Sequence, residues 1–243
     1  MIKIENIEKS FDDKPVLNGI NLTINDGESH VIIGKSGCGK SVLLKLIIAL
    51  IKADNGAIYI EDENIFDVSE KHLYEIRKKF GFLFQNAALF DSMTVEQNIS
   101  LPLVENDYGL SKTEITERME KMLAMVGLSG TENLKPSELS GGMQKRVGLA
   151  RALITNPKYI LYDEPTTGLD PIMSDAIDNL INELNHQLDV TSIVVTHDMF
   201  SVKNVAERIS MIHEGKIYFT GTLDEILSSE DSVIKSFIKR TEI

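Results

Sequence analysis

The segment Gly34–Ser41, with the sequence GKSGCGKS, constrains the fold more than any other part of the chain. It fits the pattern G-x-x-x-x-G-K-[ST], in which glycines permit a tight turn whose backbone N–H groups converge on an anion. In that pattern Lys40 reaches the β- and γ-phosphates of a nucleotide, and the Ser41 hydroxyl is offered to Mg²⁺. The positive end of a following helix would face the same phosphates. The segment therefore predicts a phosphate-binding loop between a strand and a helix.

The sequence on both sides of this loop fits the prediction. Residues 30–33 (HVII) form a short apolar run, and residues 41–51 (SVLLKLIIALI) are almost wholly apolar. The first run predicts a buried strand and the second a buried helix. The alternative is an ordinary glycine-rich turn, and the motifs further along the chain argue against it. Cys38 lies inside the loop, where we interpret it as a small filler rather than a redox switch.

Composition excludes several classes of function. The 243 residues, 42 % of them hydrophobic, suffice for one domain or two closely packed lobes. A formal net charge of −12 disfavours nucleic acid and anionic membrane surfaces as partners. The single cysteine excludes an internal disulfide and fits a reducing compartment. No signal peptide is recognisable, and no apolar run reaches the ~18 residues of a membrane-spanning helix. We expect a soluble, cytoplasmic protein whose membrane role comes through a partner.

The N-terminal part predicts an antiparallel β region beside the loop. Residues 2–7 and 16–25 read as strands, the first of them alternating between apolar and polar positions. Asn55-Gly56 predicts a turn into a further strand at 57–60.

Residues 86–139 predict a small helical lobe, because strand patterns vanish there. A capping box at 111–114 opens a helix with apolar residues at helical spacing. Those positions are Ile115, Met119, Met122 and Met125. We interpret this stripe as the core of the lobe rather than as a flexible contact surface.

Alternation of strands and helices returns after the lobe. Ser140, Gly141 and Gly142 precede a predicted helix at 143–154, and Asp170-Pro171 suits the start of another helix. The apolar face expected for that second helix comprises Ile172, Ala176, Leu180, Ile181, Leu184 and Leu188. A hairpin through Glu214-Gly215 and an amphipathic helix complete the chain.

Polar residues follow the predicted core strands. Gln85, the pair Asp163-Glu164 and His197 each come directly after or at the end of an apolar run. Ligands of open α/β sheets bind beyond the carboxyl ends of the strands, so we expect these side chains to converge on the phosphate loop. Asp163 is placed to support Mg²⁺, directly or through water, and Glu164 to accept a proton from an attacking water. Considered alone, Asp163-Glu164 would be an ordinary polar end of a strand, and His197 would be a structural histidine. Because the three residues are expected to lie together near the phosphate loop, we interpret His197 as a residue that senses phosphate.

The ordered set of motifs resembles the ATP-binding cassette (ABC) family. The set comprises the phosphate loop at 34–41, Gln85, Leu139–Gly142 (LSGG), Asp163-Glu164, Gly168–Asp170 and His197. LSGG is the specific part, since other P-loop families lack it, and the resemblance covers essentially the whole chain.

This resemblance implies an α/β fold and one nucleotide-binding domain, residues 1–243. Residues 1–85 and 140–243 would form a RecA-like P-loop NTPase core with an antiparallel β subdomain, and 86–139 an inserted α-helical subdomain. It also implies that two copies dimerise head to tail around two ATP molecules with Mg²⁺. Ser140, Gly141 and Gly142 would then touch the γ-phosphate bound by the other copy, and Asp170 would lie at the seam.

The resemblance assigns a role to each candidate residue. Phe11 would stack on adenine, the alternative being a core aromatic of the β region. Expected nucleotide contacts are Phe11, Gly34, Lys35, Ser36, Gly37, Cys38, Gly39, Lys40, Ser41, Val42, Ser140, Gly141, Gly142 and Asp170. Expected metal ligands are Ser41, Gln85 and Asp163, and expected catalytic residues are Glu164, His197, Lys40 and Gln85.

Two departures from the commonest family pattern indicate a subfamily. Met143 stands where Gln usually follows LSGG, and Val42 stands where Thr is commoner. With their flanking sequences they resemble the ATPases of MCE-domain phospholipid transporters. That resemblance implies ATP-driven lipid transport, an integral membrane permease, an MCE-domain protein, a small accessory subunit, and a place on the cytoplasmic face of the inner membrane.

Three rival classes share part of the pattern. An ABC importer of a small solute has the same catalytic residues, so the chain alone does not separate it from a lipid system. ABC proteins of translation carry two cassettes, and those of DNA repair carry long coiled coils, neither of which fits this chain. LSGG and the order of the motifs disfavour a small-molecule P-loop kinase.

Overall fold

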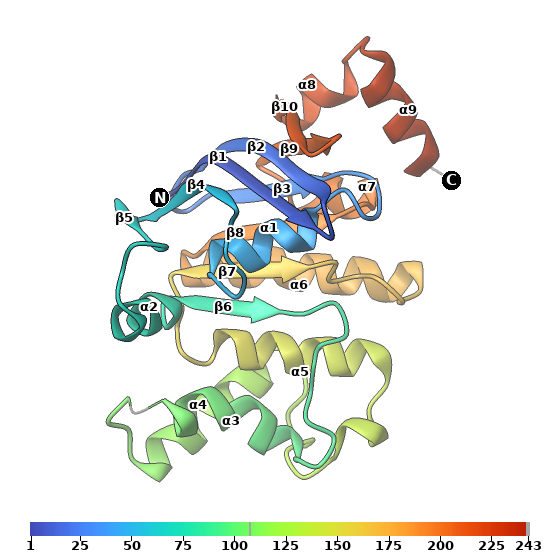
Figure 1. Cartoon of the computed structure of the whole chain (residues 1–243). Helices are drawn as coiled ribbons and strands as arrows, with labels where there is room; N and C mark the ends of the chain where they lie inside the picture. Colours follow the sequence, from blue (N-terminus) through green and yellow to red (C-terminus); the bar gives the residue numbers. More distant parts are fainter. Residues whose placement is uncertain (107, 242–243) are drawn as a thin grey trace.

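The phosphate-loop helix lies between two β-sheets in the computed structural model, which describes residues 1–106 and 108–241 (Figure 1). One sheet is antiparallel, with the order β2-β1-β4-β5, and the other has the order β10-β9-β3-β8-β7-β6. In the second sheet β9, β3, β8, β7 and β6 are parallel, and β10 is an antiparallel edge strand. This arrangement places an antiparallel β region against a parallel core.

The strands overlap the predicted runs, but β1 continues to Phe11, beyond the expected range 2–7, and β5 was not expected from the sequence. They are β1 (Ile2–Phe11), β2 (Lys14–Ile24), β3 (Ser29–Ile33), β4 (Asn55–Ile60), β5 (Glu63–Asn64), β6 (Phe80–Leu83), β7 (Tyr159–Asp163), β8 (Thr191–Thr196), β9 (Arg208–His213) and β10 (Lys216–Gly221). Every residue of β3, β7 and β8 is buried, as expected of parallel strands covered on both faces.

The helices cover both faces of the core sheet. They are α1 (Lys40–Ile47), α2 (Glu70–Arg77), α3 (Val95–Glu105), α4 (Lys112–Met125), α5 (Gly141–Leu153), α6 (Pro171–Leu188), α7 (Met199–Val205), α8 (Leu223–Leu227) and α9 (Ser232–Thr241), with a 3-10 turn at Pro136–Glu138. One apolar cluster joins α1 to the antiparallel sheet and one face of the core. A second apolar cluster joins the helices from α3 through α9 to the opposite face of the core sheet.

The predicted helical lobe consists of α3 and α4, which pack on each other and on α5. Met119 and Met122 are buried in the apolar cluster, and Ile115 and Met125 pack against it. The interpretation of the methionine stripe as core is therefore confirmed. The domain boundary at residue 139 stays a prediction, because α5 contacts both the lobe and β6.

Four local predictions were wrong. Asn55 and Gly56 begin β4 instead of forming a turn, because β1 bulges between Glu5 and Glu8 and its backbone comes close to Gly56. A Cβ on Gly56 would lie 2.4 Å from the carbonyl oxygen of Asn6, so glycine is required by close approach. The helix expected over 41–51 ends at Ile47.

The other two errors concern helix starts. Gly141 and Gly142 form the first turn of α5, with Ser140 as the capping residue, instead of preceding the helix. Ile172 was placed on the buried face of α6, yet its side chain is 80 % exposed. The first turn of α6 extends past the apolar cluster, whose contacts begin at Ile177.

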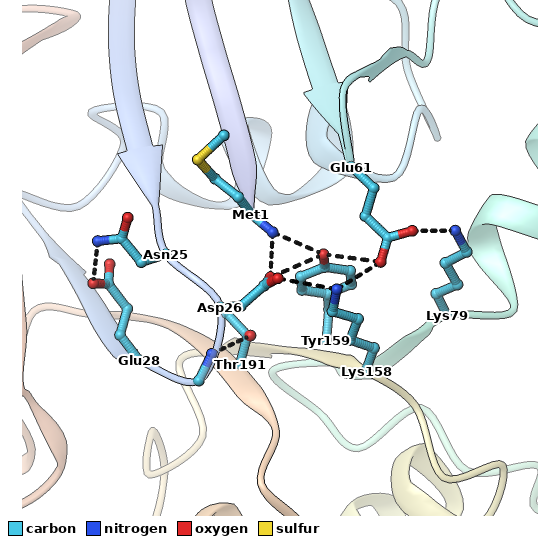
Figure 2. Close-up of polar contacts among 10 residues, drawn as sticks. Met1, Asn25, Asp26, Glu28, Glu61, Lys79, Lys158, Tyr159 and Thr191 are labelled. Carbon is cyan, nitrogen blue, oxygen red and sulfur yellow. Dashed lines mark hydrogen bonds and ion pairs between the residues drawn. The ribbon is translucent and has the colours of Figure 1, made fainter.

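An ion-pair cluster ties the two sheets together at the amino ends of the core strands (Figure 2). Lys158 Nζ lies 2.7 Å from Glu61 Oε1 and 3.0 Å from Asp26 Oδ2, and Lys79 also pairs with Glu61. Hydrogen bonds from Lys158 and Lys79 hold the pKa of Glu61 at about 2. Burial opposes the shift at Asp26, but hydrogen bonds from the chain's amino terminus and Lys158 hold its pKa at about 2. The cluster lies at the edge opposite the phosphate loop.

Asp178 on α6 is a buried carboxyl group at a packing contact between helices. It is 1 % exposed, and among the described residues its Oδ1 atom has no hydrogen-bond partner. Burial raises its pKa to about 6, with Asp198 and Asp175 adding to the rise, while hydrogen bonds with Ser201 and Asn204 partly offset it. The native state therefore holds the proton more tightly than the unfolded chain. The contribution of this group to stability consequently falls as pH rises from about 4 to about 6.

We expect Asp178→Asn to raise the free energy of unfolding at pH 7 by about 1–3 kcal/mol, because it removes a buried charge. The measurement is urea unfolding of both proteins at pH 4 and pH 7, with the exposed Asp175→Asn as a control. The advantage of Asp178→Asn should shrink at pH 4, where the native carboxyl is protonated. An equal difference at both pH values would contradict the assignment.

Candidate active site

The phosphate loop leaves the carboxyl end of β3 and turns directly into α1. Gly34 has a φ of +156°, and a Cβ there would lie 2.7 Å from the carbonyl oxygen of Ile212. Gly39 caps α1 in a left-handed conformation and gives the helix no side-chain cap. The N–H groups of the first turn of α1 are thus without the usual capping oxygen, which suits an anion at this point.

Lys40 folds back over this loop. Its side chain is 5 % exposed, and its Nζ donates to the carbonyl oxygen of Gly34 at 2.8 Å. The same ammonium lies 3.3 Å from Glu164 Oε1. The loop lysine and the acidic end of β7 therefore meet in one place.

Ser41 and Asp163 form an oxygen pair at the base of the loop. The Ser41 hydroxyl donates to Asp163 Oδ1 at 2.7 Å, and Asp163 is buried. Burial raises the pKa of Asp163, while the Ser41 hydrogen bond lowers it. A hydroxyl and a carboxylate are oxygen ligands of the kind that Mg²⁺ binds while it retains several waters. The donor set present fits a magnesium ion bound together with phosphates.

Glu164 is held from several sides. Its Oε2 atom lies 2.8 Å from His197 Nδ1 and accepts from the Thr167 hydroxyl at 3.3 Å. Its backbone adopts a φ of +49°, which is uncommon for a residue other than glycine and occurs where the surroundings hold the chain. Glu164 therefore has a fixed position at the end of β7.

A cavity of about 240 Å³ unites these groups. Its lining consists of Ser36, Gly37, Gly39, Lys40, Ser41, Val42, Gln85, Glu164 and His197. The predicted convergence of strand-end residues on the phosphate loop is thus confirmed, and Gln85 is an exposed member of the group. On the other side of the loop, Lys35, Ser36, Gly37 and Cys38 line a second hollow of about 510 Å³.

Some predicted residues lie outside this cavity. Phe11 is 45 % exposed at the end of β1, so its alternative role as a core aromatic is wrong. The ammonium group of Lys9 lies 5.3 Å from the centre of its ring. Stacking on adenine stays a prediction.

The LSGG segment also lies outside the cavity. Ser140 and Gly141 are exposed, and Gly142 packs so closely on α6 that a Cβ there would lie 2.1 Å from Met173 Cε. Asp170 caps α6 by accepting from the Met173 N–H, and it too is exposed. The starts of α5 and α6 therefore form a second polar surface, separate from the phosphate loop.

Two cations on α5, Lys145 and Arg151, belong to none of the sequence motifs. Lys145 is 5 % exposed and contacts the carbonyl oxygens of Gln85 and Glu164. Arg151 donates to the carbonyl oxygens of Ala87 and Ala88. The available signal was three cations, Lys145, Arg146 and Arg151, in the part of the helix that also holds its apolar run.

The family model described as ABC transporter matches residues 17–167. The chain belongs to the ABC transporter family. It is 40 % identical over 242 residues to the probable ribonucleotide transport ATP-binding protein mkl of Mycobacterium tuberculosis, covering 100 % of this chain and 67 % of the relative. It is 39 % identical over 242 residues to the methionine import ATP-binding protein MetN of Clostridium acetobutylicum, covering 100 % of this chain and 75 % of the relative.

Solved structures agree with this assignment. The dimeric post-hydrolysis state of the ATP-binding cassette MJ0796, bound to ADP and phosphate, superposes with a TM-score of 0.83 at 36 % identity, covering 92 % of this chain and 99 % of that chain. The expected fold class is therefore confirmed. The chain is the ATP-binding subunit of an ABC transporter and an ATPase that uses ATP with Mg²⁺. Within the described residues, no helix has the length and apolar character required to span a bilayer.

We expect Gly34→Ala to weaken nucleotide binding at least ~10-fold and to lower Tm by several degrees, because a methyl group there meets the Ile212 carbonyl oxygen and the Cys38 sulfur. Binding of a fluorescent ATP analogue and thermal unfolding are the measurements. Gly130→Ala, outside the phosphate loop, is the matched control, since its φ is also positive but a Cβ there meets no atom within 4 Å. Equal losses in the two variants would argue against the steric explanation.

Proposed function

We propose that this ATPase drives transport of phospholipid or another lipid through a separate permease, as a dimer that encloses two ATP molecules. The observation that carries the catalytic part is the cavity shared by the phosphate loop, Gln85, Glu164 and His197. The LSGG segment supports the dimeric part, because it does not line the cavity and its Ser140 and Gly141 are exposed to contact by another molecule.

Hydrolysis in this proposal is an in-line attack of water on the γ-phosphorus. Glu164 accepts a proton from the water as the new P–O bond forms and the bond to the β-phosphate oxygen breaks, which releases ADP and phosphate. His197 holds one oxygen of that carboxylate and Lys40 lies beside the other, so both of its oxygens are positioned. Mg²⁺ bound at Ser41 and Asp163 would neutralise charge on the phosphate oxygens.

The dimer is supported by the exposed starts of α5 and α6. Ser140, Gly141 and Asp170 are polar and exposed, and Ile172 beside them is 80 % exposed. In the proposed head-to-tail pair this surface covers the nucleotide of the other copy. A dimeric structure of the similar cassette MJ0796 supports the formation of a dimer.

A groove beside the helical lobe is the proposed permease site. It has a volume of about 630 Å³ and lies between α2, β6 and α3. Aromatic rings of Tyr74, Phe82, Phe84, Phe90 and Tyr108 line it. Such a groove suits an amphipathic helix. Binding there would hold the chain at the cytoplasmic face of the inner membrane.

Lipid is the favoured substrate because the sequences around the motifs resemble those of MCE-associated ATPases. Met143 and Val42 are the two residues that differ from the commonest ABC pattern. An MCE-domain protein and a small accessory subunit are then further partners. The second candidate is an importer of a small solute such as an amino acid or ion. It is favoured by the 39 % identity to a protein named for methionine import.

We expect Glu164→Gln to bind ATP with nearly unchanged affinity and to lower kcat by about 10²–10⁴-fold, because the amide accepts no proton. Steady-state phosphate release and binding of a fluorescent ATP analogue are the measurements. Asp189→Asn, on the exposed end of α6, is the control for a changed acidic residue. Full turnover by Glu164→Gln would exclude Glu164 as the base.

We expect the chain purified from native membranes in mild detergent to bring with it a multi-span permease, an MCE-domain protein and phospholipid. Mass spectrometry of protein and lipid is the measurement. Glu105→Lys reverses a charge in the groove and should lose the permease while ATPase activity of the isolated chain is retained. A permease recovered with a soluble solute-binding protein would overturn the lipid assignment and keep the catalytic one.

A further inference from the structure

Lys145 is a buried cation outside the motifs that define the family. It lies on α5, is 5 % exposed, and contacts the carbonyl oxygens of Gln85 and, at 3.4 Å, Glu164. An ammonium group buried at this depth is costly unless hydrogen bonds compensate it. These two carbonyl groups provide that compensation, so the side chain has a defined position.

The two carbonyl groups belong to neighbouring strands. Gln85 follows β6 and Glu164 follows β7, and the parallel pairing of these strands ends at Leu83 and Tyr162. Beyond that point the chains diverge into two turns. Lys145 connects the two turns beyond the point where hydrogen bonds between β6 and β7 end.

Both turns contain left-handed backbone at residues other than glycine. Glu164 has a φ of +49°, and Ala87 and Ala88 have φ values of +56° and +48°. Such conformations persist where contacts from outside the turn hold them. On α5, Lys145 contacts the first residue of one turn and the carbonyl group of Glu164, and Arg151 binds the carbonyl groups of both alanines.

The helix that carries Lys145 is the same helix that begins with LSGG. Ser140 caps α5, and Lys145 lies little more than one turn further along. A shift of the start of α5 therefore moves the ammonium group that contacts both turns. The short distance along α5 from Ser140 to Lys145 connects the LSGG surface, outside the cavity, to Gln85 and Glu164, which line the cavity.

We propose that Lys145 is a positioning residue for ATP hydrolysis, which fixes the backbone turns of Gln85 and Glu164 relative to the helix that begins with LSGG. This inference rests on the proposed role of Glu164. Lys145 does not line the cavity, so its effect is on the placement of Glu164 rather than on contact with nucleotide.

The test compares Lys145→Met, which keeps the length and loses the donors, with Lys145→Gln, which keeps an uncharged donor. Arg146→Met is the matched control, because Arg146 is the next residue on α5 and donates to the carbonyl oxygen of Val126 in the helical lobe. The measurements on the full chain are kcat, the Kd of a fluorescent ATP analogue, and Tm.

We expect Lys145→Met to lower kcat by about 10- to 100-fold with the Kd changed by less than about threefold, because a slightly misplaced catalytic group reacts slowly while binding persists. Lys145→Gln should be intermediate, and Arg146→Met should keep kcat within about threefold of wild type. If Lys145→Met does not fold, Lys145→Gln carries the same test. The proposal is overturned if Lys145→Met has a wild-type kcat, or if Lys145→Gln has one when only that variant folds. It is also overturned if kcat and the affinity for ATP fall by the same factor.

A second comparison separates this inference from the proposed role of Glu164. In a Glu164→Gln background, Lys145→Met should cause little further loss of kcat, since residues that act through one group are not additive. A further loss of the full factor shows that Lys145 acts independently and overturns the inference. A fully active Glu164→Gln protein contradicts the role of Glu164, whereas an inactive one beside a fully active Lys145→Met contradicts only the role of Lys145.

Discussion

The site depends on three short parallel strands in which every residue is buried. β3, β7 and β8 lie side by side, and their carboxyl ends carry the phosphate loop, the pair Asp163-Glu164 and His197. Because both faces of these strands are packed, the strand ends have little freedom to move. The residues that directly follow these strands are therefore held in place as well. The register of β7 on β8 fixes Asp163, and the Ser41 hydroxyl on α1 donates to it at 2.7 Å.

Charge is distributed very differently inside and outside the molecule. The chain carries a net charge of −12, yet at the strand ends two buried lysines, Lys40 and Lys145, stand beside Asp163 and Glu164. Lys40 contacts the carboxylate of Glu164 and Lys145 contacts its carbonyl group. Each charge offsets part of the desolvation cost of the opposite charge beside it. The site is therefore locally balanced before a nucleotide brings its own charge.

Local patterns in the sequence were sufficient to predict the core strands and the convergence of their ends, but not the two-residue strand β5. Parallel strands are read as continuous apolar runs, and Gln85, Glu164 and His197 follow such runs directly. What local patterns could not predict is close approach between segments far apart in the chain. Gly56 looked like a turn residue because its real constraint, the backbone of Asn6, lies 50 residues earlier. Ile172 looked buried because helical spacing does not show where the neighbouring elements end.

The proposed role of Lys145 also could not be predicted from local sequence patterns. Its role depends on two carbonyl groups at positions 85 and 164, and no pattern within α5 points to them. The phosphate loop and Glu164 lie in one cavity, whereas LSGG lies on a separate surface at the start of α5. On the proposed role of Lys145, a contact made at that surface would affect Glu164 through the part of α5 between Ser140 and Lys145. In the proposed dimer, formation of the interface and alignment of Glu164, the proposed base, are then coupled, because one helix carries both Ser140 and Lys145.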